Sequence, residues 1–455
     1  MPRIGADADD PPPSVSEIAL AQKFVERHGD DFRYVARWGR WLSWTGVHWT
    51  FDDTLHVFDL AREICAEAAA EIGDEKKSEA RRISTAQTVA AVERLAKANR
   101  KIAATVDHWD TDQWLLNTPG GTVDLRTGSL RDHRREDYIT KTTSTTPNGD
   151  CPHWMAVLDR TFRGDTELIA FVQRFLGYAL TGSTTEHALA VGIGVGANGK
   201  STIINTARGI LGDFAQVASG DTFTVTGGDR HPTELAMLRG ARLVVASETE
   251  EGRRWAEARI KALTGGDPIT ARFMRQDFFE FVPSFKLLIV SNHKPHLRNV
   301  DEAMRRRINI IPFEVVIPPA ERDPNLAEKL RAEWPGILRW MLDGCLEWQH
   351  TGLAPPAAVR IATEEYLEAE DAFGLWLAEC VEARPDRYET TAELFASWRS
   401  FADRTGEHAG SQKRFSEIMQ TRGFRPKRQG GTGRQGFAGV LLRRPDYSED
   451  TRHGQ

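Results

Sequence analysis

The sequence predicts an α/β protein with a parallel central sheet, a mainly helical N-terminal domain and a C-terminal winged-helix domain. Between residues 151 and 315, short β-branched and other apolar runs alternate with helical segments, which is typical of a parallel sheet covered by helices. Residues 55–105 are rich in Ala, Glu, Lys and Arg and contain few helix breakers, so we expect two helices there. Near the end, two capped helices are followed by two short strands around a glycine-rich turn.

Length and composition exclude several classes of protein. The chain has 455 residues, roughly three domains at about 150 residues each. No apolar run reaches the roughly 20 residues of a membrane-spanning helix, and the acidic, proline-rich N-terminus lacks the apolar core of a signal peptide. The four cysteines lie far apart, which argues against a zinc ribbon or a disulfide framework. Since the net charge is −6, contacts to nucleic acid must come from local basic surfaces.

We divide the chain into four parts. Residues 1–14 are expected to form a flexible tail, and residues 15–150 an N-terminal helical and mixed domain. Residues 151–365 form the sheet domain with a helical extension, and residues 366–455 the winged-helix-like domain.

Four tryptophans of the N-terminal domain alternate along a segment with a glycine turn, which predicts a small hairpin. We expect their rings to form a compact core, and the alternative is a platform for base stacking. The four residues are Trp38, Trp41, Trp44 and Trp49.

The clearest motif is the glycine loop GVGANGKS at 194–201, which fits the pattern GxxxxGK[ST]. It lies between a strand expected at 188–193 and a segment with helical spacing, which is the context of a phosphate-binding loop. Glycines let backbone N–H groups face a phosphate, the lysine neutralises phosphate charge, and the serine hydroxyl ligates Mg²⁺. The sequence therefore predicts a site for ATP and Mg²⁺ formed by Gly194, Gly196, Asn198, Gly199, Lys200, Ser201 and Thr202.

Polar residues follow the next predicted strands. Glu248 comes after the strand expected at 243–246, and we expect this strand to lie beside the one that precedes the glycine loop. Glu248 is thus the candidate acid that holds Mg²⁺ and polarises the attacking water. Asn292, after the strand expected at 287–291, is placed to sense a γ-phosphate. Before the strand expected at 308–313, one residue of the basic triplet could act as an arginine finger on a neighbouring subunit's nucleotide, with Arg306 and Arg307 as the candidates.

The order of Lys200, Glu248, Asn292 and Arg306 resembles that of superfamily-3 helicases, the AAA+ motors of small DNA viruses, phages and plasmids. The segments 261–276, 281–295 and 301–314 are similar to the helicase part of phage and plasmid primase–helicases, and 117–141 resembles the lead-in of that family. The resemblance covers roughly residues 15–350. It implies a homo-hexameric ring with an AAA+ core that hydrolyses ATP and threads single-stranded DNA.

The resemblance also implies roles for single residues. Glu248 corresponds to the Walker B acid, although the dicarboxylate of many relatives is Ser247–Glu248 here, and Asn292 corresponds to the sensor. The stretch 261–276 matches the channel hairpin, whose side chains suit phosphate contact and base stacking. A plain solvated hairpin is the alternative. The residues concerned are Arg272, Phe273 and Arg275, with Lys261 at DNA or at the subunit interface.

The chain departs from this family in one respect. Full-length relatives carry a primase domain ahead of the helicase, whereas only a short segment precedes the glycine loop here. We therefore expect priming to reside on a separate primase or polymerase. Asp107, Asp110 and Asp112 form the tightest acidic group of that segment, and we interpret them as structural.

The C-terminal pattern predicts a winged helix with 411–421 as recognition helix and 430–436 as wing tip. Between residues 411 and 444, nine Lys or Arg residues accompany one acid, Glu417. This asymmetry favours contacts with DNA phosphates, and the alternative is docking of a subunit or partner protein. The candidate contacts are Lys413, Arg414, Arg425, Lys427 and Arg428.

These features together predict an ATP-dependent replicative DNA helicase of a phage, satellite or mobile element. Its partners would be single-stranded and forked DNA, without a membrane, and its location the cytoplasm of a bacterial host. The alternative is an ATP-dependent, origin-binding initiator without processive unwinding, which strand displacement would distinguish. A small-molecule kinase is disfavoured, because no substrate lid is evident and the Asn-then-Arg order fits a ring motor.

Overall fold

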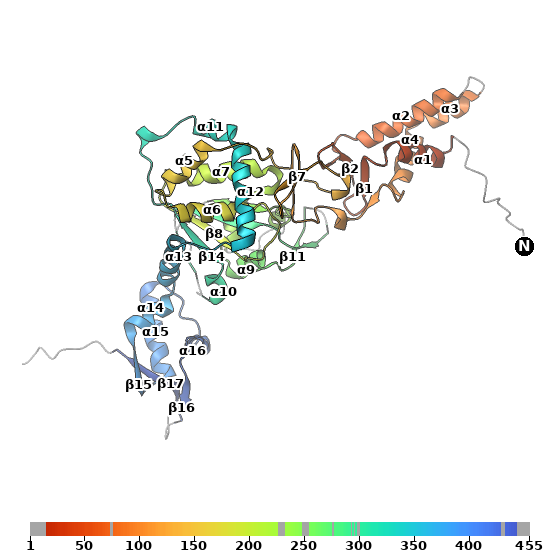
Figure 1. The fold of residues 1–455 in the computed structure, drawn as a ribbon. Coiled ribbons are helices and arrows are strands. Elements are labelled where there is room, and N and C mark those ends of the chain that lie inside the picture. Colours follow the sequence, from red (N-terminus) through yellow and green to blue (C-terminus); the bar gives the residue numbers. More distant parts are fainter. Residues whose placement is uncertain are drawn as a thin grey trace, which may run out of the picture.

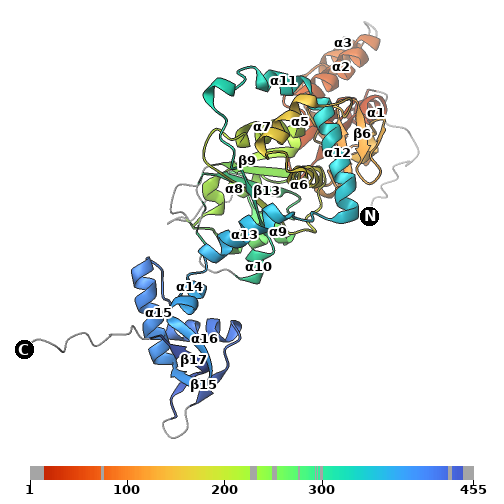
Figure 2. The same cartoon turned by 60° about the vertical axis from the view of Figure 1, so that its left-hand side comes forward.

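The computed structural model describes residues 15–72, 76–225, 233–247, 254–274, 277–292, 294, 296–297, 301–428 and 433–443. In Figures 1 and 2 the central sheet and its helices lie between an N-terminal part and a C-terminal part. Within these described ranges, no helix is long and apolar enough to cross a membrane.

The N-terminal part packs helices and a small sheet around an apolar cluster that includes Leu20, Phe24 and Ile64. Its helices are α1 (Glu17–His28), α2 (His56–Glu71), α3 (Lys77–Ile83) and α4 (Ala86–Lys97). The sheet has the order β3-β2-β1-β4, with β1 (Phe32–Val35), β2 (Arg40–Trp44), β3 (Trp49–Phe51) and β4 (Ala103–Ala104).

The predicted tryptophan hairpin is present as β2 and β3, which pair antiparallel. Trp49 is fully buried, and its ring centroid lies 5.7 Å from that of Trp109, so the tryptophans contribute to the core as expected. Three helices instead of two occupy residues 55–105. The extra boundary is a cap: the Thr85 hydroxyl accepts a hydrogen bond from the Thr88 N–H at 3.2 Å and starts a new helix there.

A second small sheet and two helices lead into the central sheet. The strands β5 (Leu115–Thr118), β6 (Gly121–Asp124) and β7 (Ser129–Arg131) pair antiparallel. The helices α5 (Pro152–Thr161) and α6 (Thr166–Tyr178) follow. The Ser144 N–H donates to the Ile210 carbonyl at 2.9 Å, which fixes the end of this lead-in to the sheet domain.

The central sheet has five parallel strands in the order β14-β8-β13-β10-β9. They are β8 (Leu189–Ile193), β9 (Ala215–Ser219), β10 (Leu243–Ser247), β13 (Lys286–Ser291) and β14 (Ile308–Pro312). Because all strands are parallel, their carboxyl ends meet at one edge, where Ile193 pairs with Ser291 and Val290 pairs with Ser247. This edge carries the glycine loop.

The predicted parallel α/β sheet is confirmed, with two differences. The strand β10 is not beside β8, because β13 lies between them, and a strand pattern along the chain does not determine lateral order. The edge strand β9 was not predicted. Its sequence AQVAS has only one β-branched residue, and its side chains are half-buried or exposed.

Helices cover both faces of the sheet. One apolar cluster joins α5, α6, α7 (Lys200–Leu211) and α12 (Trp334–Thr351) to one face through Ala190, Val245 and Ile311. A second cluster joins α9 (Glu257–Gly265) and α13 (Ala357–Ala369) to the other face through Val191, Val244 and Ile310. The remaining elements of this part are α8 (Thr233–Ala236), β11 (Ile269–Ala271), β12 (Phe279–Phe281), α10 (Glu302–Arg305) and α11 (Leu326–Ala332).

Two buried cations hold the amino edge of the sheet, opposite the glycine loop. The Lys286 amino group donates to the backbone carbonyls of Thr181 and, at 3.1 Å, Ser183. The Arg242 guanidinium donates to the Leu115 carbonyl at 2.7 Å. Burial lowers the pKa of Lys286, and lowers that of Arg242 to about 10. Both side chains tie the preceding segments to the strand ends.

The C-terminal part begins with α14 (Ala372–Cys380) and β15 (Val381–Thr390). The predicted helices follow as α15 (Thr391–Thr405) and α16 (Gln412–Thr421), and the predicted strands as β16 (Pro426–Arg428) and β17 (Gln435–Leu442). The sheet has the order β15-β17-β16 and is antiparallel. Its core includes Trp376, Trp398 and Phe415.

Two adjacent acids join the sheet domain to the C-terminal part. The Glu370 carboxylate accepts hydrogen bonds from the Leu297 N–H at 2.9 Å and from the His296 ring at 3.1 Å. Asp371 caps α14, and its carboxylate pairs with the Arg422 guanidinium at 2.6 Å. One acid therefore contacts the loop that follows β13, and the other contacts the end of α16.

Candidate functional site

The glycine loop connects β8 to α7 at the carboxyl edge of the sheet. Gly199 caps the start of α7 with φ +86°, a left-handed conformation that glycine adopts without strain. A Cβ atom at Gly194 would lie 2.1 Å from the Phe313 carbonyl oxygen, so this glycine allows the loop to pack directly on the end of β14. No neighbour lies within 4 Å of a Cβ at Gly196, so packing among the described residues does not require glycine there.

Lys200 is the first residue of α7 and is 6% exposed. Its amino group donates to the Gly194 carbonyl and, at 3.2 Å, to the Asn292 amide oxygen. Burial lowers the pKa of Lys200. Two of the predicted residues are thus brought together, because β13, which ends beside Asn292, is the direct neighbour of β8.

The other predicted loop residues have different surroundings. Asn198 is 2% exposed, and its amide donates to the Val195 carbonyl and, at 3.1 Å, to the Phe313 carbonyl. Its side chain therefore braces the loop. Ser201 is exposed and Thr202 half-buried at the start of α7.

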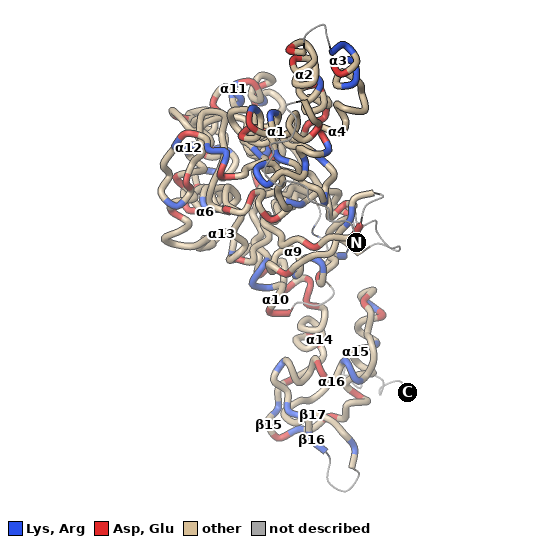
Figure 3. Tube along the Cα trace, turned by 90° about the vertical axis from the view of Figure 1, so that its right-hand side faces the viewer, with Lys and Arg blue, Asp and Glu red and all other residues tan. Residues whose placement is uncertain are grey.

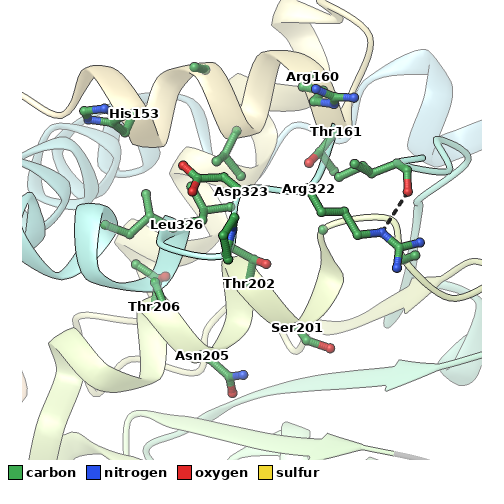
Figure 4. A pocket seen from close by; sticks show the side chains of 18 of the residues that line it. His153, Arg160, Thr161, Ser201, Thr202, Asn205, Thr206, Arg322, Asp323 and Leu326 are labelled. Atoms are coloured by element: carbon green, nitrogen blue, oxygen red, sulfur yellow. Dashed lines mark hydrogen bonds between the residues drawn. The ribbon is translucent and has the colours of Figure 1, made fainter. Parts of the chain in front are cut away.

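A cavity of about 780 Å³ opens beside the start of α7 (Figure 4). Its lining comes from α5, α7, α11 and the segment before α11, and includes Ser201, Thr202, Asn205, Arg322 and Asp323. The Arg322 guanidinium donates to the Ile317 carbonyl at 3.0 Å, which holds that segment at the rim. Sequence reasoning missed this cavity, and the only signal for it was the polar face of α7 formed by Thr202, Asn205 and Thr206.

One wall of the cavity carries an unsatisfied polar atom. The Thr161 hydroxyl is buried and has no hydrogen-bond partner among the described residues. A Cβ at Gly199 would lie 2.6 Å from it. The absence of a side chain at Gly199 thus leaves room between α5 and the glycine loop.

The three arginines before β14 have different partners. Arg305 forms an ion pair with Glu364 at 2.7 Å. Arg307 is 6% exposed, and its guanidinium donates to the Thr264 hydroxyl at 3.1 Å and to the Ala303 carbonyl at 2.7 Å. Arg306 is exposed, and its side chain forms no hydrogen bond or ion pair with another described residue. Arg307 is therefore occupied inside its own subunit, whereas Arg306 faces outward.

The segment 261–276, predicted as the channel hairpin, contains the second half of α9 and the strand β11, and β11 pairs antiparallel with β12. The Arg272 guanidinium lies 4.8 Å from the centre of the Phe278 ring, and the Phe273 and Phe279 rings stack at 5.5 Å. Sequence reasoning missed Phe278, which is 53% exposed; the pairing of β11 with β12 places it near Arg272.

The strand β12 contacts the N-terminal part through its first residue, Phe279, next to the turn. The Arg239 guanidinium lies 5.4 Å from the centre of the Phe279 ring and 5.7 Å from the centre of the Trp38 ring. Lys261, predicted at DNA or at a subunit interface, forms an ion pair with Asp301 of the same chain.

Two predicted residues, Glu248 and Arg275, lie outside the described residues. Ser247, the last residue of β10, lies at the carboxyl edge of the sheet, and Glu248 is the next residue in the sequence. Among the described residues, no group of three His, Cys, Asp or Glu side chains could hold a metal ion. Asp110 instead accepts hydrogen bonds from the Thr140 N–H and hydroxyl at 2.8 and 2.5 Å, which agrees with a structural role.

The basic residues predicted at the C-terminus lie on α16 and on the strands that follow (Figure 3). Lys413 and Arg414 are exposed on α16, Lys427 and Arg428 are exposed on β16, and Arg425 is exposed just before it. The turn between β16 and β17 contains residues outside the described ranges, including Gly430 of the predicted wing tip.

Comparison with known proteins adds sequence and fold relatives. A family described as "D5 N terminal like" matches residues 21–163. A "Family of unknown function (DUF5906)" matches residues 193–307, from the glycine loop to the three arginines. "Putative helicase L207/L206" of Acanthamoeba polyphaga mimivirus is 26% identical over 297 residues, 58% of this chain and 30% of that protein. "Putative helicase 022R" of Frog virus 3 (isolate Goorha) is 25% identical over 272 residues, 55% of this chain and 28% of that protein.

The resemblance to superfamily-3 and primase–helicase proteins is confirmed. The chain spans less than a third of the length of these two helicase relatives. Solved structures described as the "NrS-1 C terminal region" share the fold of this helicase-like chain. One has a TM-score of 0.52 at 9% identity and covers 94% of this chain and 100% of its own, and another has a TM-score of 0.51 at 11% identity and covers 90% and 88%.

Proposed function

We propose that the protein is an ATP-dependent DNA helicase, a ring motor that moves along single-stranded DNA. The observation that carries this proposal is the pair Lys200 and Asn292. The Lys200 amino group at the start of α7 and the Asn292 amide just after β13 meet at 3.2 Å beside the glycine loop. This arrangement suits a γ-phosphate, because the cation neutralises its charge and the amide orients the attacking water.

The triphosphate would lie along the glycine loop at the start of α7, where backbone N–H groups and the helix dipole favour an anion. The nucleoside would occupy the cavity of about 780 Å³ beside it, whose lining includes Asn205 and Arg322. In hydrolysis, a water oxygen bonds to the γ-phosphorus while the bond to the β,γ-bridging oxygen breaks, so that ADP leaves with that oxygen.

Mg²⁺ fits the hydroxyl and carboxylate donors that the chain offers at this edge. The exposed Ser201 hydroxyl would bind it together with phosphate oxygens, and Glu248 would hold it or polarise the water. Bound Mg²⁺ would neutralise phosphate charge. Asn198 would act indirectly, by bracing the loop against Phe313.

A homo-hexamer would complete the site. Because Arg305 and Arg307 are engaged within their own chain, Arg306 is the better candidate for a finger on the neighbouring subunit's nucleotide. The hairpin of β11 and β12 would contact single-stranded DNA through Arg272, Phe273 and Arg275, and the exposed Phe278 extends this surface.

The C-terminal part would be a winged-helix unit that binds duplex DNA. Its order, with α15, α16, β16 and β17 in succession and β15 completing the sheet, supports this assignment, as does the excess of basic residues between 411 and 444. The same basic surface favours the second candidate function, an ATP-dependent, origin-binding initiator. In either case we propose a bacterial cytoplasm as the location.

Phosphate release and displacement of a labelled strand from a forked duplex test the proposal. The wild-type protein should show both, with ATPase stimulated by single-stranded DNA. Lys200→Ala should lose about a hundredfold or more in turnover, because transition-state charge is no longer stabilised, while Lys23→Ala on the distant helix α1 should be unaffected. ATPase without strand displacement would favour the initiator. Near-normal turnover by Lys200→Ala would refute the site.

A further inference from the structure

The helix α16 has one apolar face and one polar face. Phe415 and Met419 are buried in the C-terminal core. On the outward face, Gln412, Ser416 and Gln420 recur at every fourth position, and Gln412 and Gln420 are exposed. Their amide and hydroxyl groups form an uncharged stripe along the helix, with basic residues and Glu417 beside it.

This stripe lines a groove of about 810 Å³ between α16, the start of α15 and the start of β17. Charged residues flank the uncharged stripe, with Lys413 on α16 and Arg434 before β17. The Tyr388 hydroxyl donates to the Arg434 carbonyl at 2.7 Å, which fixes the backbone at the base of the turn. Lys413 and Arg434 at the rim of the groove are suited to contact DNA phosphates. The uncharged side chains of the stripe are then free to contact base edges.

The dimensions of the stripe fit the major groove of DNA. A rise of about 1.5 Å per residue places Gln412 and Gln420 roughly 12 Å apart along the helix, the span of three to four base pairs. The major groove of B-DNA is about 12 Å wide and admits an α-helix. Within the major groove, a glutamine amide can bond adenine through two hydrogen bonds. The Ser416 hydroxyl donates to the Gln412 carbonyl at 3.1 Å, so it can accept a hydrogen bond from the amino group of a base.

The position of Glu417 supports base contacts instead of phosphate contacts alone. It is the only acid between residues 411 and 444, and it lies in the lining of the same groove. A carboxylate beside phosphates would be repelled, whereas one that faces base edges can accept a hydrogen bond from the amino group of cytosine.

We infer that Gln412, Ser416 and Gln420 read the base sequence of duplex DNA, and that this unit directs the motor to a specific site. The inference rests on the proposed winged-helix unit. In this unit, Gln412, Ser416 and Gln420 would recognise the base sequence, and the basic side chains would make the non-specific phosphate contacts.

Selection from random duplexes with the full-length protein, followed by anisotropy titrations on the selected and a scrambled duplex, tests the inference. We expect selection to return a preferred sequence. The double variant Gln412→Ala/Gln420→Ala should lose roughly 5- to 150-fold in discrimination per lost contact, with an unchanged salt slope. Gln87→Ala, an exposed glutamine on α4, should match the wild type.

A charge variant separates the two kinds of contact. Lys413→Ala/Lys427→Ala should weaken both duplexes equally and reduce the salt slope by about 0.9 per lost phosphate contact. Gln420→Lys should move the preference at one position toward guanine. Selection that returns no sequence, with salt-sensitive binding retained, overturns base readout but leaves the DNA-binding unit standing. A protein that hydrolyses ATP and displaces strands but binds no duplex overturns the inference while the helicase proposal stands.

Discussion

The Lys200 amino group contacts two neutral oxygens, the Gly194 carbonyl and the Asn292 amide oxygen, and burial lowers its pKa. A bound phosphate would raise that pKa. We therefore expect ATP binding at alkaline pH to take up protons, and affinity to fall as the pH rises through the lowered pKa of the free protein.

Calorimetry with a non-hydrolysable ATP analogue in buffers of different ionisation enthalpy measures this uptake, which should approach about one proton. Lys200→Arg is the matched control, because its guanidinium stays charged and should take up none. Identical proton uptake by the wild type and by Lys200→Arg would show that a group other than Lys200 takes up the proton.

Arg306 and Arg307 should differ sharply in mixed rings. Arg306→Ala should reduce ATPase by about 10³–10⁵, and mixing it with Lys200→Ala should restore activity at interfaces that combine an intact Lys200 with an intact Arg306. Arg307→Ala should instead lower the melting temperature, because it leaves the buried Thr264 hydroxyl and Ala303 carbonyl without this donor. Complementation by Arg307→Ala, and not by Arg306→Ala, would reverse the assignment.

The hairpin of β11 and β12 should contribute to binding of single-stranded DNA and not to hydrolysis of ATP. Replacing Arg272, Phe273 and Phe278 by alanine should weaken single-strand affinity by about 1–3 kcal/mol for each lost stacking contact and leave basal ATPase largely intact. Val282→Ala removes an exposed apolar side chain just after β12 that has no ring, so it should have little effect. Loss of basal ATPase with normal strand affinity would contradict this role.

The buried Lys286 should stabilise the start of β13. Lys286→Met leaves the Thr181 and Ser183 carbonyls without their donor, which costs about 1–3 kcal/mol for each unsatisfied buried group. Urea denaturation measures the loss, with Lys23→Met on α1, a half-buried lysine that pairs with Glu67 at 3.8 Å, as control. Equal midpoints for the two variants would show that the cation is not needed for stability.

In the whole molecule, Glu370 and Asp371 connect the nucleotide site to the C-terminal part. The loop after β13 begins at Asn292 and contacts Glu370, while Asp371 pairs with Arg422 at the end of α16. Glu370→Ala should therefore reduce any difference in duplex affinity between ATP-bound and nucleotide-free protein. Coupling free energies are typically 1–3 kcal/mol. Anisotropy titrations of duplex DNA with ATP-bound and with nucleotide-free protein measure this coupling free energy. Glu368→Ala on α13 is the control.

The sequence predicted what depends on local pattern. The glycine loop, the strands at the sheet edge and the tryptophan hairpin follow from residue types at fixed spacing. The lateral order of the strands, the cavity beside α7 and the separation of Arg306 from Arg307 depend on contacts between distant segments. The buried partners of Arg307, for example, are Thr264 and Ala303, and nothing in the run of three arginines indicates which guanidinium is buried.

Arg239 lies between the Trp38 ring of the N-terminal part and the Phe279 ring of the hairpin. A hairpin that shifts with a moving strand must lose contact with this guanidinium or draw it away from Trp38. Each cation–π contact contributes about 0.5–1 kcal/mol at an exposed site and more when desolvated, which is of the order of thermal energy. In the proposed motor, a contact this weak would break and re-form as the hairpin moves, without preventing the movement.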